Sequence, residues 1–270
     1  MSAPRHLPNG LDLVEPSPVA GLAVFEHRVD DARVTVICVH GGLDRGGSFA
    51  RLARRLTRDD LVTYDRRGYQ GSRHLRPLGL GPDVEDLVSL IDAEPGRPVI
   101  LLGHSFGGVV TLGAALARPN RVAGLLCFET PLPWVLNRHS NHPPLTEDTA
   151  SEAERFFRRM VGNSAWERLS DAERESRWRD GDGLVTDLKA IRGTPSSPYD
   201  ERILTVPMIY AYGDRHATEY YDELTALLHQ RNPLITGRLL PGAPHGAHLA
   251  SPDQLANLLD ELVGMTCASA

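Results

Sequence analysis

Cysteine is scarce in this sequence, because the 270 residues contain only Cys38, Cys127 and Cys267. No CxxC pair and no cluster of cysteine and histidine occurs, so we expect no structural zinc and no other metal or cofactor. The odd and sparse count is typical of a reducing compartment, which predicts a cytoplasmic location. Cys38 and Cys127 lie inside apolar runs, where a small buried thiol packs well.

Long apolar runs and an excess of positive charge are also absent. Without an apolar run of roughly 18 residues no membrane span is predicted, and residues 1–18 lack the apolar stretch of a signal peptide. The net charge of −6 gives no reason to expect nucleic acid or an anionic membrane as a partner. We therefore expect a small-molecule substrate as the partner, and leave open whether the chain forms a homodimer. Lysine occurs once, at Lys189, which we attribute to codon bias in a GC-rich genome.

What the sequence does contain is a regular alternation of short apolar runs and longer amphipathic stretches. Runs that are apolar throughout predict strands buried on both faces, and the stretches between them have helical spacing. This order predicts an α/β fold with a mostly parallel central sheet flanked by helices, with antiparallel strands added at one edge by residues 22–29. The expected strands are 34–39, 61–64, 98–102, 121–128, 206–212 and 234–240, and the expected helices are 48–56, 83–91, 106–117, 218–230 and 253–263.

One stretch interrupts the alternation. Residues 130–204 contain no strand signal; a proline-rich lead is followed by polar sequence of helical character. Because strands precede and follow this stretch, we expect an inserted helical cap at 130–204. Residues 1–129 and 205–270 would then form the core domain.

The pentapeptide Gly103-His104-Ser105-Phe106-Gly107 lies between an apolar strand and a helix rich in small residues. A serine hydroxyl needs a base to take its proton and a position where attack is sterically open. A sharp strand–turn–helix connection with flanking glycines provides such a position and projects the serine oxygen. The context predicts that Ser105 is a nucleophile.

Several segments together resemble the α/β-hydrolase superfamily over nearly the whole chain. They are VHGG at 39–42, YDRRGYQGS at 64–72, GHSFGG at 103–108, YAYGD at 210–214 and PGAPHGAHLASP at 241–252. The resemblance implies the α/β-hydrolase fold with an inserted helical cap. FETPLPW at 128–134 is similar to a group of small bacterial hydrolases whose acidic residue ends that strand.

The resemblance also implies an oxyanion hole and substrate contacts. The backbone N–H of Phe106, which follows the nucleophile, and that of Gly42, after His-Gly, are the expected donors, with Leu43 as the alternative to Gly42. Leu43, His104 and Trp134 are expected to contact the substrate. By resemblance, neither His40 nor His104 transfers the proton, and the arginines and glycines of YDRRGYQGS have a structural role.

Two histidines, His245 and His248, follow the last expected strand. By resemblance the catalytic histidine follows a short Gly/Ala turn, and a second polar residue stands three positions later. This pattern favours His245 as the base, whereas His248 shapes the loop or begins the final helix. His139 and His142, in the expected cap, are interpreted as surface residues.

Two carboxylates can orient the base, since the acid lies between serine and histidine in this fold. Asp214 follows an expected strand, but the family commonly has its acid three residues after the glycine, and His216 stands there. Glu129 ends the preceding strand, where a buried carboxylate is costly unless paired, and a histidine would be such a partner. We favour Glu129 and keep Asp214 as the alternative.

These residues predict a serine hydrolase of the carboxylesterase type that cleaves an ester, thioester, lactone or amide of a small molecule through an acyl-enzyme. By resemblance, epoxide hydrolases and haloalkane dehalogenases use aspartate at the position of Ser105, which argues against those reactions. The alternatives are a non-hydrolytic enzyme of the same fold, such as a lyase or perhydrolase, and a non-catalytic ligand binder. Aromatic residues of the expected cap, namely Phe156, Phe157, Trp166 and Trp178, either line a modest apolar pocket or form the core of the cap.

Overall fold

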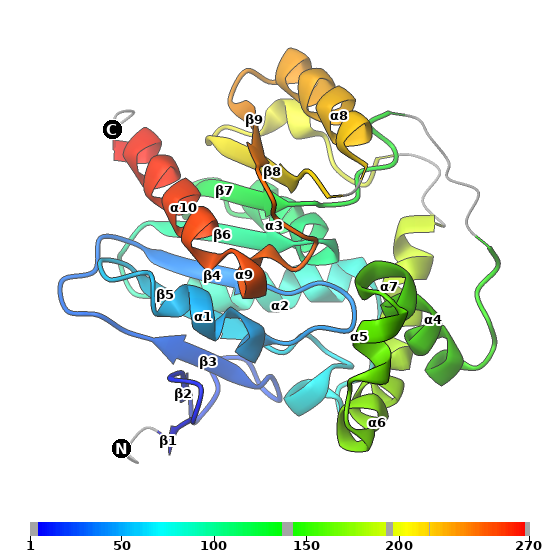
Figure 1. Ribbon diagram of the computed structural model, residues 1–270. Helices are drawn as coiled ribbons and strands as arrows, with labels where there is room; N and C mark the ends of the chain where they lie inside the picture. Colours follow the sequence, from blue (N-terminus) through cyan, green and yellow to red (C-terminus); the bar gives the residue numbers. More distant parts are fainter. Residues whose placement is uncertain (1–4, 137–142, 193–196, 216, 268–270) are drawn as a thin grey trace.

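The computed structural model describes residues 5–136, 143–192, 197–215 and 217–267, which fold around one mixed sheet (Figure 1). The strands of the described chain lie in the order β1-β2-β3-β5-β4-β6-β7-β8-β9. Their bounds are β1 (Arg5–His6), β2 (Asp12–Leu13), β3 (Val24–His27), β4 (Thr35–Val39), β5 (Asp60–Tyr64), β6 (Val99–His104), β7 (Val122–Phe128), β8 (Met208–Gly213) and β9 (Ile235–Leu240).

The neighbouring strands β5, β4, β6, β7, β8 and β9 pair in parallel, and β1, β2 and β3 are added antiparallel beside β5. The predicted mostly parallel sheet and its antiparallel edge are therefore confirmed. In the centre, His104 of β6 stands opposite Phe128 of β7, and Phe128 stands opposite Ala211 of β8. Because neighbouring parallel strands end together, the residues that follow β6, β7 and β8 emerge side by side at one edge of the sheet.

The central strands form because they are apolar on both faces. Every residue of β4, β6 and β8 is buried, and so is each residue of β7 except Ala123. Helices α2 (Leu80–Ala93), α3 (Phe106–Ala117) and α8 (Thr218–Arg231) contribute to the apolar core on one face of the sheet. On the other face, α1 (Ala50–Ala53), α9 (Ala247–Ala250) and α10 (Pro252–Cys267) cover a second apolar core (Figure 1).

Helix α3 has the bounds that the sequence predicts, whereas the helix expected over 48–56 does not form as one element. A 3-10 helix η1 (Gly46–Phe49) leads into the single turn of α1, and the last turns close through short-range bonds from Arg55 to Leu52 and from Leu56 to Ala53. These tighter turns keep the side chains of Phe49, Leu52 and Leu56 on the second apolar core. Core packing thus overrides the regular helical spacing.

Between β7 and β8 the described residues contain helices and no strand. The helices are α4 (Thr149–Val161), α5 (Asn163–Glu167), α6 (Asp171–Arg179), α7 (Gly181–Arg192) and the 3-10 helix η3 (Glu201–Ile203). The first four are here called the α4–α7 layer. Two of them begin at side-chain caps: at the start of α4 Asp148 accepts from the N–H of Ala150, and at the start of α6 Ser170 forms a capping box with Glu173.

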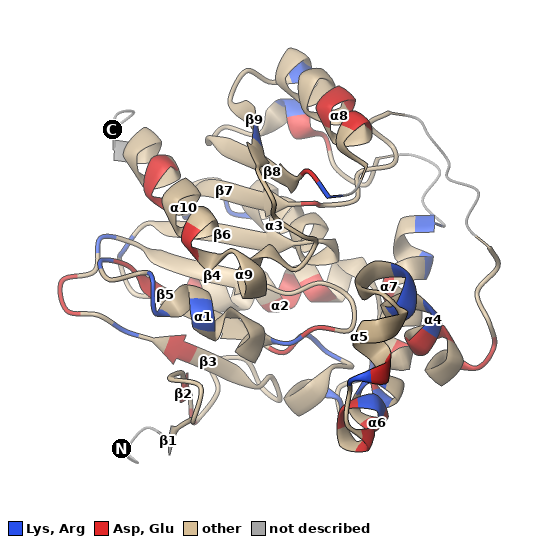
Figure 2. Ribbon diagram, in the orientation of Figure 1, with Lys and Arg blue, Asp and Glu red and all other residues tan. Residues whose placement is uncertain are grey.

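Charge is distributed unevenly between the sheet and the α4–α7 layer. Figure 2 shows the central strands free of Lys, Arg, Asp and Glu, whereas α4, α6 and α7 carry both signs of charge. In the part of the chain that is described, no helix is both long and apolar enough to span a membrane.

Candidate active site

Ser105 stands at the turn between β6 and α3 with φ 52° and ψ −126°. Its N–H donates to the carbonyl of Phe128 at 2.9 Å, which holds the turn against β7. The flanking glycines allow this turn because nothing larger fits. A Cβ at Gly103 would lie 2.4 Å from the Cα of Gly108, and one at Gly107 would lie 2.2 Å from the carbonyl oxygen of Val39. The predicted strand–turn–helix around Ser105 is therefore present.

Glu129 follows β7 directly and reaches His245. The Nδ1 of His245 lies 2.5 Å from Oε2 of Glu129, and Oε1 of Glu129 accepts the N–H of Gly213 at 3.0 Å. The side chain of Glu129 is 3% exposed and that of His245 is 15% exposed. Because a carboxylate can only accept, Nδ1 carries the proton and Nε2 is left to accept one.

Asp214, the alternative acid, occupies a different place. It is exposed, and its carboxylate accepts the N–H of Gly242 at 2.8 Å. Within the described ranges no ion pair joins it to a histidine. The structure thus brings Glu129, and not Asp214, to the ring of His245. His216, like His139 and His142, lies outside the described residues.

The backbone around this site is strained. Leu43, Ser105 and Glu129 all have positive φ, at 55°, 52° and 44°, and they make up half of the six described non-glycine residues of this kind. Such conformations cost on the order of 1–3 kcal/mol each and persist where the surrounding structure imposes them. Three of them follow the carboxyl ends of β4, β6 and β7, which makes this edge of the sheet the candidate site.

The loop after β4 is held against the serine turn. Burial lowers the pKa of His40 to about 3, so its ring stays neutral, with Nε2 accepting the N–H of Arg66 at 2.9 Å and Nδ1 donating to the carbonyl of Gly41 at 2.7 Å. A Cβ at Gly41 would lie 2.8 Å from the Cβ of Ser105. His40 therefore shapes this loop and has no free ring nitrogen for proton transfer.

Two backbone N–H groups at this point have no partner. The N–H groups of Gly42 and Phe106 donate to no acceptor among the described residues. Phe106 is the first residue of α3, where backbone N–H groups and the helix dipole favour negative charge. Both residues line the same cavity as Ser105, so both groups are available to an anionic oxygen there.

Two cavities meet at His245. The smaller, of about 200 Å³, is lined by Ser105, Phe106 and Glu129 from the sheet edge and by apolar side chains of α7. The larger, of about 720 Å³, is lined by Leu43, Asp44, His104 and His248 among others. Gly42, Phe156, Met160 and His245 line both cavities, so a molecule bound beside His245 can extend in two directions.

Two of the three residues expected to contact the substrate line a cavity, and one does not. Leu43 and His104 line the larger cavity, whereas Trp134 packs against the first apolar core and lines neither cavity. Among the aromatic residues of the α4–α7 layer, Phe156 and Phe157 face the cavities. Trp166 is buried and contacts Phe157 edge to face and Trp178 at a tilt, with ring centroids 5.4 and 6.0 Å apart.

Sequence reasoning did not identify how the α4–α7 layer attaches to the core. The fully buried guanidinium of Arg66 donates to Asp83 of α2 at 2.9 Å and to Asp187 of α7 at 2.6 Å, and the hydroxyl of Tyr69 also donates to Asp187 at 2.6 Å. These four residues are called the Arg66 cluster below. A structural role was expected for the YDRRGYQGS segment, which contains Arg66 and Tyr69, but not for their partners. Asp187 lies 121 positions from Arg66, so no spacing pattern connects the two residues.

The amino-acid sequence is similar to those of known hydrolases. A profile of the alpha/beta hydrolase family matches residues 36–258. Lipase LipV of Mycobacterium tuberculosis is 34% identical over 94 residues, which make up 35% of this chain and 36% of that protein. Monoglyceride lipase of Homo sapiens is 31% identical over 102 residues, 35% of this chain and 34% of that protein. The match thus spans about a third of the length of these relatives.

Solved structures match over much more of the chain. A lipase-esterase related protein from Clostridium acetobutylicum has a TM-score of 0.68 at 16% identity and covers 90% of this chain and 100% of its own. MenH from S. aureus has a TM-score of 0.66 at 14% identity, covering 90% and 98%. These likenesses concern the fold, and the family profile covers most of the sequence. The chain therefore belongs to the alpha/beta hydrolase family.

Proposed function

We propose that this protein is a serine hydrolase that cleaves an ester-type bond of a small molecule through Ser105, His245 and Glu129. The observation that carries the proposal is the 2.5 Å contact between His245 Nδ1 and Glu129 Oε2, beside a serine held at positive φ in the same cavity wall. The lipases among the relatives support hydrolysis of an ester.

The proposed reaction uses these groups in two steps. His245 Nε2 takes the proton of Ser105, whose oxygen attacks the acyl carbon, and Glu129 stabilises the imidazolium that forms. The N–H groups of Gly42 and Phe106 would hold the oxyanion, a contribution of about 3–4 kcal/mol for each donor. His245 then protonates the leaving group, and water attacks the acyl-enzyme by the same route.

The two cavities suggest how a substrate lies. The smaller contains Ser105 and both oxyanion donors beside the apolar Leu184, Leu188 and Ile191 of α7, which suits a short to medium acyl group. The larger opens on the other side of His245 and suits the leaving group. In this proposal residues 130–204 are a cap, because a Cβ at Gly42 would lie 2.9 Å from Leu184 of the α4–α7 layer.

The test is intact mass after incubation with a fluorophosphonate, which phosphonylates an activated serine. Wild type is expected to gain one adduct and Ser105→Ala none. Ser89→Ala is the matched control, because Ser89 is exposed on α2 and its hydroxyl bonds only to the carbonyl of Glu85. A series of p-nitrophenyl esters, from acetate to dodecanoate, would then measure the acyl preference.

An unlabelled wild type that also hydrolyses no ester or thioester of the series would overturn the proposal and leave a ligand-binding protein. Labelling of wild type and of Ser105→Ala alike would place the reactive group elsewhere. Labelling without release of a carboxylic acid from any substrate would point to a non-hydrolytic reaction at the same serine.

A further inference from the structure

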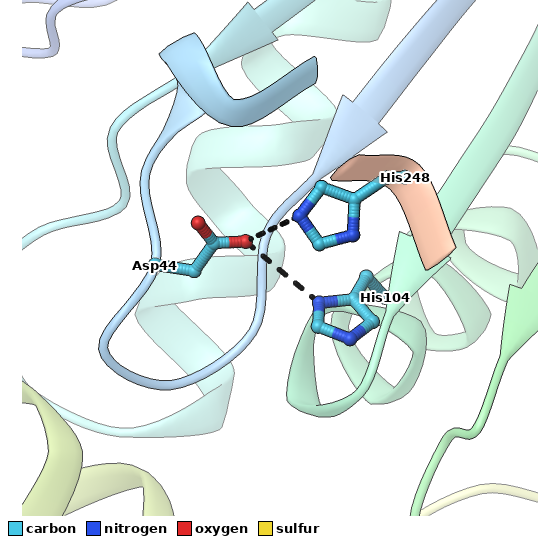
Figure 3. Close-up of side chains that lie close together, drawn as sticks. All are labelled: Asp44, His104 and His248. Carbon is cyan, nitrogen blue, oxygen red and sulfur yellow. Dashed lines mark ion pairs between the residues drawn. The ribbon is translucent and has the colours of Figure 1, made fainter. Parts of the chain in front are cut away.

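The larger cavity contains a group of side chains that the proposed hydrolysis does not use. Asp44, from the loop after β4, His104, at the end of β6, and His248, from α9, point toward one another (Figure 3). Oδ2 of Asp44 lies 3.0 Å from Nε2 of His248 and 3.8 Å from Nδ1 of His104, and the three atoms all lie within 4.8 Å of one another. They are called the Asp44 cluster below.

The ring of His104 has a defined proton arrangement. Its Nε2 lies 2.9 Å from the backbone carbonyl of His245, and since a carbonyl can only accept, Nε2 carries the proton. Nδ1 therefore presents a lone pair. This atom is buried, has no hydrogen-bond partner among the described residues, and faces the carboxylate of Asp44.

A lone pair that faces a carboxylate is unfavourable unless a cation or a donor lies between them. His248 adds a second unsatisfied ring. It is 2% exposed, and neither of its nitrogens makes a hydrogen bond to a described residue despite the short approach to Asp44.

We propose that the Asp44 cluster binds a divalent transition-metal ion of the Zn²⁺ type. Two neutral imidazoles and one carboxylate are donors that such ions prefer. Metal–ligand bonds of about 2.1 Å in a tetrahedron separate the ligand atoms by about 3.4 Å. The separations of 3.0 and 3.8 Å from Asp44 Oδ2 bracket that value, and all three ligand atoms lie within 4.8 Å of one another, so side-chain shifts that bring the atoms closer together would allow coordination.

The position of the cluster gives the ion a role. Asp44 lies two residues after Gly42, His104 immediately precedes Ser105, and His248 follows His245 by three residues. A bound ion would therefore connect the three segments of the chain that carry the proposed oxyanion donor, nucleophile and base. Three protein ligands leave a coordination position for water or a leaving-group oxygen, and all three ligands line the larger cavity.

The test measures the metal itself, on untagged protein freed of metal with a chelator. Titration calorimetry is expected to show one Zn²⁺ bound for each chain, and Co²⁺ is expected to give the visible absorption of a tetrahedral nitrogen and oxygen site. Asp44→Asn and His248→Gln should each weaken Zn²⁺ binding by roughly 100-fold or more. His74→Gln is the matched control, since His74 is exposed and outside the cluster, and it should bind like wild type.

The same titration on Ser105→Ala separates this inference from the proposed hydrolysis, because that variant lacks the nucleophile and keeps all three ligands. Equal binding by wild type and Ser105→Ala would support a site that stands apart from the serine chemistry. No uptake by wild type would overturn the inference, and so would binding that Asp44→Asn and His248→Gln leave unchanged. Should both variants fail to fold, an octahedral or absent Co²⁺ spectrum in wild type would overturn it.

Discussion

The sheet and the α4–α7 layer are held together by different forces. The central strands β4, β6 and β7 contain no Lys, Arg, Asp or Glu and are almost entirely buried. In the layer, α6 buries no residue and α4 buries only Glu152 and Ala153. Ion pairs such as Arg158 with Glu154, and Arg179 with Glu175, run along its surface.

This difference has energetic consequences. Burying one leucine or isoleucine side chain contributes about 1.5–3 kcal/mol, whereas an exposed ion pair contributes about 0–1 kcal/mol. The α4–α7 layer should therefore open locally at a lower free energy than the sheet. The groups proposed for chemistry stand on the stiff part of the molecule, and residues that shape the cavities, such as Phe156 and Leu184, stand on the softer part.

The largest effect is expected at the carboxylate of Glu129. Glu129→Gln keeps the shape of the side chain but no longer stabilises a protonated His245, so kcat should fall by roughly 10⁴-fold. Asp214→Asn should change kcat by less than about threefold, because Asp214 caps a backbone N–H instead. Steady-state kinetics on an ester found with the wild type would measure both. The reverse order of effects would assign the acid to Asp214.

The next largest effect is expected at the Arg66 cluster, which joins the α4–α7 layer to the core. Asp187→Ala removes the acceptor of Arg66 and Tyr69 and leaves a buried charge with one partner fewer, which should cost about 3 kcal/mol. Hydrogen exchange should speed up in α7 by far more than in β6. Lys189→Ala, an exposed change on the same helix, should alter neither. Equal acceleration in α7 and β6 would mean that the layer and the sheet unfold as one unit.

Within the layer, Phe156 and Met160 line both cavities, and Phe156 is the aromatic one. Phe156→Ala should raise KM by about tenfold, the equivalent of about 1.4 kcal/mol of lost contact, with kcat nearly unchanged. Phe156→Leu should recover most of the affinity. A fall in kcat with unchanged KM would instead place Phe156 among the groups that act in the transition state.

The last prediction is a pH dependence of stability at the Arg66 cluster. Arg66 faces two carboxylates, and burial raises the pKa of Asp83 to about 7 despite the attraction of Arg66. Between about pH 4 and pH 7 the folded state then keeps a proton that the unfolded state has lost. Stability should therefore fall as pH rises through this window, by at most about 1.4 kcal/mol for each pH unit.

Denaturant unfolding at several pH values would measure this slope, and Asp83→Asn should flatten it. Part of the slope will remain, because burial raises the pKa of Asp65 to about 6 and acts in the same direction. Asp44 acts in the opposite direction, since its pKa lies below the ordinary value and its contribution is lost only as pH falls below about 4. An unchanged slope in Asp83→Asn would show that the Arg66 cluster keeps no extra proton.

Much of the sheet was predictable because its strands are apolar on both faces, a pattern that local sequence carries. Helix α3 and the turn at Ser105 were predictable for the same kind of reason, since glycine is required where an added Cβ would lie only 2.2–2.4 Å from a backbone atom. The failures concern residues whose partners are remote. Trp134 stands near the glutamate in sequence, but its ring packs into the first apolar core and does not face the cavities.

Clusters assembled from distant positions were beyond the reach of spacing. The ligand atoms of the Asp44 cluster come from residues 44, 104 and 248, and the Arg66 cluster joins residues 66, 69, 83 and 187. The arrangement of β4, β6 and α9 brings the first set together, and the packing of the segment after β5 against α2 and α7 brings the second set together. The choice between Glu129 and Asp214 also depended on the register of the strands, because both follow strands that end at the same edge.

The backbone conformation of Ser105 lowers the stability of the fold at the position of the proposed nucleophile. At φ 52° and ψ −126° any side chain is strained, and glycine would sit there at lower free energy. A sequence optimised for folding alone would place glycine at this turn and lose the hydroxyl. The folded chain is thus slightly less stable than a Ser105→Gly variant would be. In the proposed function, the hydroxyl that this strained turn carries is the nucleophile.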